Sequence, residues 1–258
     1  MRYVIPYKLN LEDEINKMSS VKARLRAFPA QCRDLKLYSP EDYPYKINFP
    51  THVEKVILDS GAFSLSQIGG TMDDSYLYAL FQFYFYNADE RCLCVAPDKY
   101  LDPITSMVNF KKFQDIIQEY EDFCDTGFTK NIKIAAVLQP THNKRLDIKS
   151  MLKQAEFYLD YTDVIFISNP NLTSAEAKML NIQKLLKQLR HLGVKYIHIL
   201  GAGWSITDIK GWLNIGYADS IDSIAYYTTT DEKEFGSLEP LENIKNIMGV
   251  VNKWKPLK

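Results

Sequence analysis

The chain alternates short, continuously apolar segments with longer amphipathic ones. The apolar segments have the length of strands, and they lack the apolar–polar alternation expected when one face of a strand meets water. Continuous apolar runs are typical of parallel strands that are covered on both faces. The pattern predicts strands at Tyr3–Tyr7, Val56–Leu58, Cys92–Ala96, Ile132–Leu138, Asp163–Ile167, Tyr196–Leu200 and Ser220–Ala225.

The amphipathic segments predict helices between these strands. Apolar residues recur at spacings of three and four in several of them. Residues 173–176, Thr-Ser-Ala-Glu, have the form of a capping box, and Gly193 after His191-Leu192 is a typical C-terminal stop. We expect helices at Asp73–Asn87, Ile104–Phe123, Ile148–Tyr161 and Thr173–Leu192.

Strands that alternate with helices imply right-handed βαβ crossovers and a parallel sheet. A barrel of such units commonly forms a single domain of about 250 residues, and this chain has 258. No repeat or Gly/Ser linker divides it. The sequence therefore predicts an α/β fold, a (β/α)8 TIM-type barrel formed by residues 1–258 as one domain. An open doubly wound sheet is the alternative.

The composition is that of an ordinary globular protein, with 46% hydrophobic and 24% charged residues. No apolar run reaches the roughly 20 residues that cross a bilayer. The N-terminal segment is too short and too polar for a signal peptide. These features predict a cytoplasmic protein without a membrane partner.

The net charge of −1 provides no global attraction to nucleic acid. Two stretches, residues 17–33 and 178–195, are nevertheless basic and lack acidic neighbours. They are interpreted as solvated helix faces, with contacts to backbone phosphates as the functional alternative. The basic residues are Lys17, Lys22, Arg24, Arg26 and Arg33 in the first stretch, and Lys178, Lys184, Lys187, Arg190 and Lys195 in the second.

Of the four cysteines, only Cys92 and Cys94 are close in sequence. No further Cys/His pair stands at the spacing of a zinc site. We therefore expect buried free thiols and no metal site. No cofactor is expected.

In both candidate folds, functional residues gather at the carboxyl ends of the strands. Several polar residues and glycines follow the predicted strands, and one more, Asp222, lies in the last of them. Those after the strands each have a structural explanation, such as a helix cap or a turn residue. Together they predict a pocket with carboxylates and an amide, without a Ser/His triad. The residues are Asp59, Ser60, Asp98, Gln139, Gly201, Gly203 and Asp222.

Paired carboxylates without a metal suit chemistry at a sugar carbon. One acid attacks or stabilises an oxocarbenium-like centre, while the other handles the proton of the departing or arriving group.

The ordered motifs resemble those of the tRNA-guanine transglycosylase superfamily, which includes DNA-acting 7-deazaguanine transglycosylases of phages and bacterial genomic islands. The resemblance covers about residues 56–225. Residues 59–63, Asp-Ser-Gly-Ala-Phe, resemble the family's Asp-Ser-Gly-Gly-Phe/Tyr loop. Asp98 resembles the acidic residue that reads the base, and Gln139 resembles the glutamine of an Ile-Val-Gln-Gly-Gly turn.

Two later segments match the family as well. Residues 200–203, Leu-Gly-Ala-Gly, resemble the family's Met/Leu-Gly-Val-Gly. Residues 218–223, Ala-Asp-Ser-Ile-Asp-Ser, resemble the segment that holds the nucleophile.

The resemblance implies a role for each matched residue. Asp222 would attack C1′ of a nucleotide and release guanine, leaving a covalent glycosyl-enzyme, and Asp59 would be the general acid and base. Phe63 would stack on the heterocycle. The base edge would be hydrogen-bonded by Asp98, Gln139 and Ser60, and close approach of the backbone would be allowed by Gly201 and Gly203.

The chain also departs from the family pattern. Ala62 replaces the second glycine, Pro140 follows Gln139, and residues 167–170 replace a Gly-Gly-Leu strand end. The Cys/His zinc subdomain of the tRNA enzymes is missing. The expected partners are therefore a polynucleotide, DNA before RNA, and a free 7-deazaguanine base. An N-glycoside hydrolase with the same carboxylates, or a non-catalytic nucleic-acid-binding barrel subunit, are the alternatives; the presence of both Asp59 and Asp222 speaks against the last.

Overall fold

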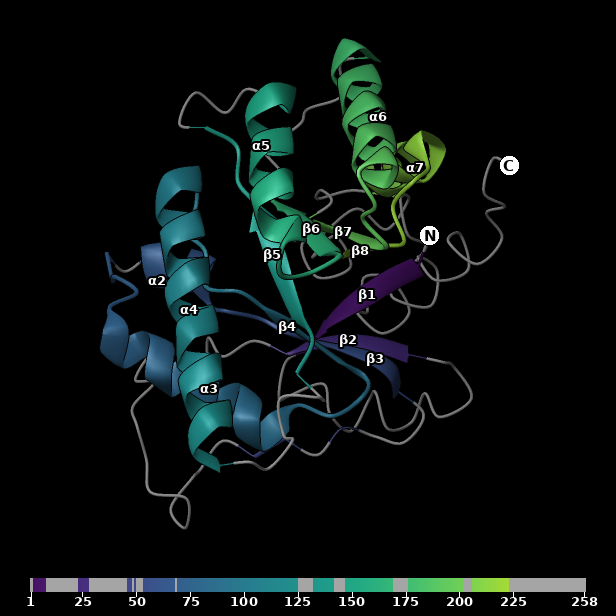
Figure 1. Ribbon diagram of the computed structural model, residues 1–258. Coiled ribbons are helices and arrows are strands. Elements are labelled where there is room, and N and C mark those ends of the chain that lie inside the picture. The colour runs from purple at the N-terminus through teal and green to yellow at the C-terminus, as the bar shows by residue number, and fades with distance from the viewer. Residues whose placement is uncertain are drawn as a thin grey trace. The chain divides into compact units, whose positions relative to one another are not determined.

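The computed structural model describes residues 2–7, 23–27, 46–47, 49, 53–67, 69–124, 132–141, 147–168, 176–201 and 206–222. The chain divides into two compact units. We call Tyr7–Gln139 the N-terminal unit, and Met1–Pro6 with Pro140–Lys258 the C-terminal unit. Both contain parallel strands that alternate with helices, which confirms the predicted α/β class (Figure 1).

The N-terminal unit holds four described strands, all parallel, in the order β2-β3-β4-β5. Every residue of β4 and β5 is buried, and so are Val53 and Val56–Leu58 of β3, so both faces of these strands are covered there. The elements are β2 (Ala23–Ala27), β3 (Val53–Leu58), α2 (Ala62–Gln67), α3 (Asp74–Asn87), β4 (Cys92–Val95), α4 (Pro103–Cys124) and β5 (Ile134–Leu138).

Local signals explain where the helices of this unit begin. Asp73 caps α3, because its side chain accepts a hydrogen bond from the backbone N–H of Tyr76 at 2.9 Å. Asp102 accepts from the N–H of Thr105 at 3.0 Å, and Pro103 stands at the first helical position, which proline favours. The buried Tyr84 of α3 donates its hydroxyl proton to the carbonyl of Val95 at 2.6 Å, which ties this helix to the end of β4.

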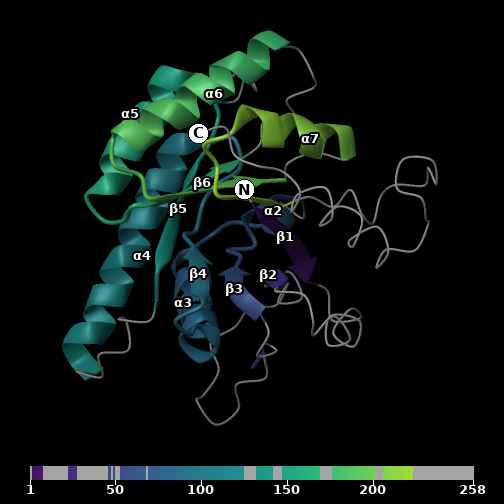
Figure 2. The ribbon, with the colours of Figure 1, turned by 90° about the vertical axis from the view of Figure 1, so that its right-hand side faces the viewer.

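The C-terminal unit pairs its strands in parallel in the order β6-β7-β8-β1. Figures 1 and 2 show α5, α6 and α7 on the same face of β6, β7 and β8. Gly193 has a left-handed φ of 102° just after α6, which ends that helix as its sequence predicts. The elements are β1 (Arg2–Tyr7), α5 (Ile148–Leu159), β6 (Val164–Ser168), α6 (Glu176–His191), β7 (Tyr196–Leu200), α7 (Ile206–Ile215) and β8 (Ser220–Asp222).

All seven predicted strands and all four predicted helices are found, with ends that shift by a few residues. The capping residues 173–175 of α6 and the predicted strand end 223–225 lie outside the described residues. The sequence interpretation missed the helices α2 and α7 and the strand β2.

The interpretation of residues 17–33 as a helix face is wrong for Ala23–Ala27, which form β2. The segment reads Ala-Arg-Leu-Arg-Ala, in which apolar and charged residues alternate. A period of two is the signature of a strand, and here it outweighs the high charge that suggested a solvated helix.

Cys92 and Cys94 are free thiols inside β4, as expected from the sequence. Burial raises the pKa of the Cys92 thiol to about 12 and that of Cys94 well above its usual range. Within the described ranges, no group of three or more His, Cys, Asp or Glu side chains is placed to hold a metal ion. Among the helices of the described residues, none could span a bilayer.

Candidate active site

Three predicted site residues of the N-terminal unit form one hydrogen-bonded cluster. Ser60 follows β3, Asp98 follows β4, and Gln139 follows β5. Asp98 Oδ1 accepts a hydrogen bond from Ser60 Oγ at 2.9 Å, and its Oδ2 accepts from Gln139 Nε2 at 2.5 Å. All three side chains are buried. Neighbouring parallel strands end at one edge of the sheet, so motifs about 40 residues apart are brought into direct contact.

The orientation of the Gln139 amide is determined by the loop after β4. The backbone N–H of Leu101 donates to Gln139 Oε1 at 3.2 Å, so the amide oxygen faces Leu101 and the amide nitrogen faces Asp98. Leu101 adopts a left-handed φ of 59°, which costs a non-glycine residue about 1–2 kcal/mol. Strain of this kind is typically retained where a loop builds a functional site.

Asp98 is the residue of the cluster whose ionisation is most altered. Burial raises the pKa of its carboxyl group to about 6, and the nearby charge of Asp59 adds to the increase. The hydrogen bonds from Ser60 and Gln139 oppose it, because they stabilise the ionised form. Asp98 therefore changes its charge near pH 6, two units above an ordinary aspartate.

Asp59 is buried in the turn between β3 and α2. Its Oδ1 accepts a hydrogen bond from the backbone N–H of Gly61 at 2.9 Å, and Gly61 has a left-handed φ of 76°. Tyr76 of α3 donates its hydroxyl proton to the carbonyl oxygen of Ser60 at 2.6 Å. These two hydrogen bonds fix the turn that carries Asp59 and Ser60. Asp59 therefore also has the structural role of a turn residue, which was the alternative explanation of its position in the sequence.

Phe63 in the first turn of α2 is 58% exposed, which is unusual for so large an apolar side chain. Its ring meets that of Tyr100 edge to face, with centroids 5.7 Å apart. Tyr100 belongs to the same loop as Leu101, so one loop supplies both an aromatic partner for Phe63 and the contact that orients Gln139. An exposed phenylalanine ring, supported by the half-buried Tyr100 and close in sequence to the polar cluster, is suited to stack on a flat heterocycle.

Asp222 is the last residue of β8 in the C-terminal unit, and it is buried. Its Oδ1 accepts a hydrogen bond from the backbone N–H of Gly201 at 2.6 Å. Gly201 follows β7 directly and has a left-handed φ of 61°, so a residue with a side chain would be strained there. His198 Nε2 lies 3.4 Å from the same Oδ1. Gly203 lies outside the described residues.

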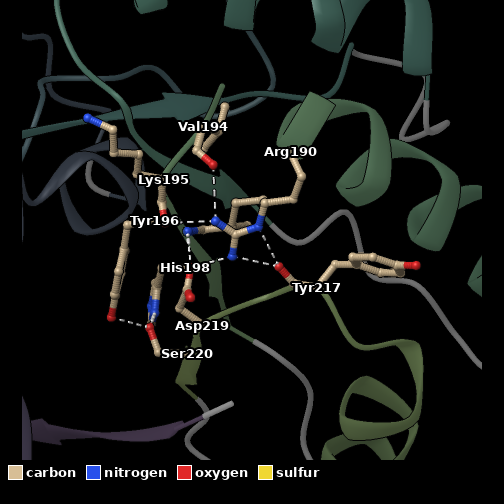
Figure 3. A network of polar contacts seen from close by, with 9 residues as sticks. Arg190, Val194, Lys195, Tyr196, His198, Tyr217, Asp219 and Ser220 are labelled. Carbon is tan, nitrogen blue, oxygen red and sulfur yellow. Dashed lines mark hydrogen bonds and ion pairs between the residues drawn. The ribbon is translucent and has the colours of Figure 1, made fainter. Parts of the chain in front are cut away.

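Asp219, three residues before Asp222, is engaged in a different network (Figure 3). Its Oδ2 accepts hydrogen bonds from Arg190 Nη2 at 2.5 Å and from the backbone N–H of Ile197 at 2.7 Å. The Arg190 guanidinium also donates to the carbonyl oxygens of Val194, Lys195 and Tyr217. Asp219 therefore joins α6 to the start of β7 and β8, a structural role.

We expect Asp219→Asn to lower the free energy of unfolding by about 1–2 kcal/mol, since a charge-assisted bond to Arg190 is lost at a partly exposed site. Urea unfolding followed by circular dichroism measures this. The variant keeps a carbonyl oxygen for the N–H of Ile197, so its native fold is expected to persist.

Part of the second basic stretch is accounted for by ion pairs. Arg190 forms an ion pair with Asp219, and Lys195 Nζ lies 2.7 Å from Asp163 Oδ2. Acidic partners that are distant in sequence become neighbours in the fold. Lys184 and Lys187 are exposed on α6, as interpreted from the sequence.

Sequence reasoning did not single out Tyr100, Leu101 or His198. For His198 a signal exists, because Tyr196 and His198 stand at alternate positions of an otherwise apolar strand and so share one face. For Leu101 no sequence signal exists, since its left-handed backbone and its contact with Gln139 depend on the folded loop. Asp59 and Asp222 belong to different units, and that they line one pocket stays a prediction.

Comparison with models of known protein families and with curated proteins finds no match.

Proposed function

We propose that this protein is a base-exchange transglycosylase, a pentosyltransferase that replaces guanine in a polynucleotide, DNA before RNA, with a 7-deazaguanine derivative. The observation that carries the proposal is the buried Ser60–Asp98–Gln139 cluster. The three motifs were predicted to read one base, and their side chains contact one another directly.

The donor and acceptor pattern of this cluster suits the edge of a guanine. Guanine presents the N1–H and N2–H₂ donors next to the O6 acceptor. An ionised carboxylate accepts about four hydrogen bonds, so the bonds from Ser60 and Gln139 alone do not exhaust Asp98. A base that has left its stack would meet the exposed Phe63 ring with its flat face.

In the proposed reaction the Asp222 carboxylate attacks C1′ as the C1′–N9 bond breaks. Asp59 enters the cycle in its protonated form and gives this proton to the departing guanine. The incoming 7-deazaguanine returns a proton to Asp59, and its N9 then attacks C1′ and releases Asp222. Two displacements restore the original configuration, and no further reactant is needed. The hydrogen bond from Gly201 keeps the Asp222 carboxylate in a single orientation at the carboxyl end of β8.

The proposal requires Asp59 and Asp222 to line one pocket, and therefore includes a single (β/α)8 barrel as the complete fold. Parallel strands and alternating helices in both units support it. The carboxyl ends of strands in such a barrel face one mouth, which is where enzymes of this fold carry their sites.

Base exchange is tested with defined oligonucleotides. The protein is incubated with a guanine-containing DNA or RNA strand and a 7-deazaguanine base, and the digested nucleosides are identified by mass spectrometry. We expect a deazaguanosine nucleoside and released guanine, with the double variant Asp59→Asn/Asp222→Asn as the inactive control.

Two outcomes contradict the proposal. Guanine release without incorporation indicates an N-glycoside hydrolase. Binding of the oligonucleotide without either product indicates a non-catalytic barrel.

A further inference from the structure

A row of polar side chains runs along one face of β7 and β8 and ends at Asp222. His198 pairs with Ser220 in the strand register, so alternate residues of both strands share this face. Tyr196 Oη lies 2.7 Å from Ser220 Oγ, and Ser220 Oγ lies 2.7 Å from His198 Nδ1 (Figure 3). His198 Nε2 in turn lies 3.4 Å from Asp222 Oδ1.

The imidazole of His198 is held in a single position. The His198 and Ser220 side chains are fully buried. The ring of Phe166 on β6 packs against the imidazole, with ring centroids 4.6 Å apart, at the position that pairs with His198 in the strand register. A buried imidazole gains little from water, so its protonation is determined by its neighbours in the protein.

Those neighbours select one tautomer. An ionised Asp222 has no proton to donate, so the nitrogen that faces it is favoured as N–H. When Nε2 of a neutral imidazole carries the proton, Nδ1 is an acceptor, and the Ser220 hydroxyl donates to it. Ser220 Oγ then accepts the proton of the Tyr196 hydroxyl. With this tautomer the hydroxyl protons of Tyr196 and Ser220 point along the row toward His198. The Nε2–H then lies on the side of Asp222, 3.4 Å from Oδ1, as an electrostatic contact and not as a hydrogen bond.

We infer that His198, held as the Nε2–H tautomer by Ser220 and Tyr196, is a positioning residue that orients the Asp222 carboxylate and favours its ionised form. Its part in catalysis rests on the proposed function, whereas the tautomer itself does not. The Gly201 N–H donates a hydrogen bond to Oδ1, and His198 Nε2 lies 3.4 Å from the same oxygen, so both contacts favour a rotation of the carboxylate that keeps Oδ1 on their side.

The tautomer is measured without any substrate. Nitrogen-15 NMR of the full chain labelled at its histidines distinguishes Nδ1–H from Nε2–H, and the His198 signals are those lost in His198→Gln. We expect the Nε2–H form in the wild type and a mixture or the opposite tautomer in Ser220→Ala. Ser150→Ala, on the outer helix α5, is the matched control and should leave the signals unchanged. An Nδ1–H form in the wild type, or no change in Ser220→Ala, overturns the inference.

Two substitutions separate the functions of the two ring nitrogens. His198→Gln places an amide nitrogen near the position of Nε2, and His198→Asn places its amide near Nδ1. The Gln variant should form the covalent adduct with a polynucleotide at a rate within about tenfold of wild type. The Asn variant should lose about 10²-fold, because it places no N–H beside the Asp222 carboxylate. Equal losses in both variants would show that the residue only fills space.

The two measurements also separate this inference from the proposed function. If the wild type holds the Nε2–H tautomer but forms no adduct, the proposed function fails and the tautomer stands. If the wild type forms the adduct and the His198 tautomer is mixed, the positioning role fails and the transglycosylase stands. Should the Asn variant not fold, the Ser220→Ala spectrum still decides.

Discussion

Asp222→Asn is expected to abolish the covalent adduct between the protein and a polynucleotide. The substitution removes the charge that attacks C1′ and leaves the size of the side chain almost unchanged. The asparagine oxygen can still accept the hydrogen bond from Gly201, so the end of β8 is expected to keep its structure. A loss of the adduct would then mean that the nucleophile is missing, and not that the fold is disturbed.

Asp59→Asn is expected to behave differently, because Asp59 is assigned the proton and not the attack. Asp222 remains a nucleophile in this variant. Departure of the old base and entry of the new one should both slow by about 10²–10⁴-fold, the usual contribution of a general acid or base. The asparagine oxygen can accept from the N–H of Gly61, so the turn into α2 is expected to persist.

The two variants are compared by incubating each with a short oligonucleotide and separating denaturant-resistant adducts on a gel. Asp219→Asn is the matched control, since it is the same substitution on the same chain segment, in a residue bound to Arg190. It should retain the adduct. An adduct that survives in Asp222→Asn, or one that disappears in Asp219→Asn while the protein stays folded, contradicts the assignment of the nucleophile.

The second large effect concerns the stability of the fold around Asp98. Its pKa is about 6 in the folded protein against 3.8 for an ordinary aspartate, so the folded state binds the proton more tightly. Below about pH 4, Asp98 is protonated in both the folded and the unfolded state, so it does not lower the free energy of unfolding there. As the pH rises through the window from 4 to 6, stability is lost, up to about 3 kcal/mol above pH 6.

Asp98→Asn removes this titration. The difference in the free energy of unfolding between variant and wild type should shift in favour of the variant by about 3 kcal/mol between pH 4 and pH 7. Other titrating groups are common to both proteins and cancel. Urea unfolding at each pH provides the measurement, and a difference that stays constant across the window would contradict a buried, ionised Asp98 at neutral pH.

The affinity for the base should increase as the pH rises, whereas the stability of the fold decreases. The ionised carboxylate accepts the N–H groups of the base, so the wild type should lose about tenfold in affinity for each pH unit below 6. Asp98→Asn should bind about 10²–10³-fold more weakly at pH 7.5 and show no such pH dependence. Calorimetric titration with a free 7-deazaguanine base measures both, and equal affinity of the two proteins at pH 7.5 would exclude Asp98 from base recognition.

Sequence patterns predicted most of the elements because burial on both faces leaves a strong signature. Strands such as Ile134–Leu138 are apolar at every position and are buried at every position. The strand β2 was not predicted, because its arginines alternate with apolar residues and it contains no continuous apolar run. The helices α2 and α7 are short, so their periodicity is too brief to distinguish them from loops.

The candidate site was predictable to the extent that function follows strand ends. Ser60, Asp98 and Gln139 were each identified by position, and the hydrogen bonds among them depend on neighbouring parallel strands. The raised pKa of Asp98 depends on the burial of this one carboxylate, which its own sequence position does not reveal.

By itself, the sequence determined the α/β class and the order of most strands and helices along the chain, because these follow from periodicity and local propensity. It also determined which residue types stand at the strand ends. Only the tertiary structure decided that Asp219 is bound to Arg190 while Asp222 faces Gly201 and His198. The two aspartates are three residues apart and chemically identical. What separates them is the partners that other elements of the fold bring to each one, and such long-range contacts exist only once the chain has folded.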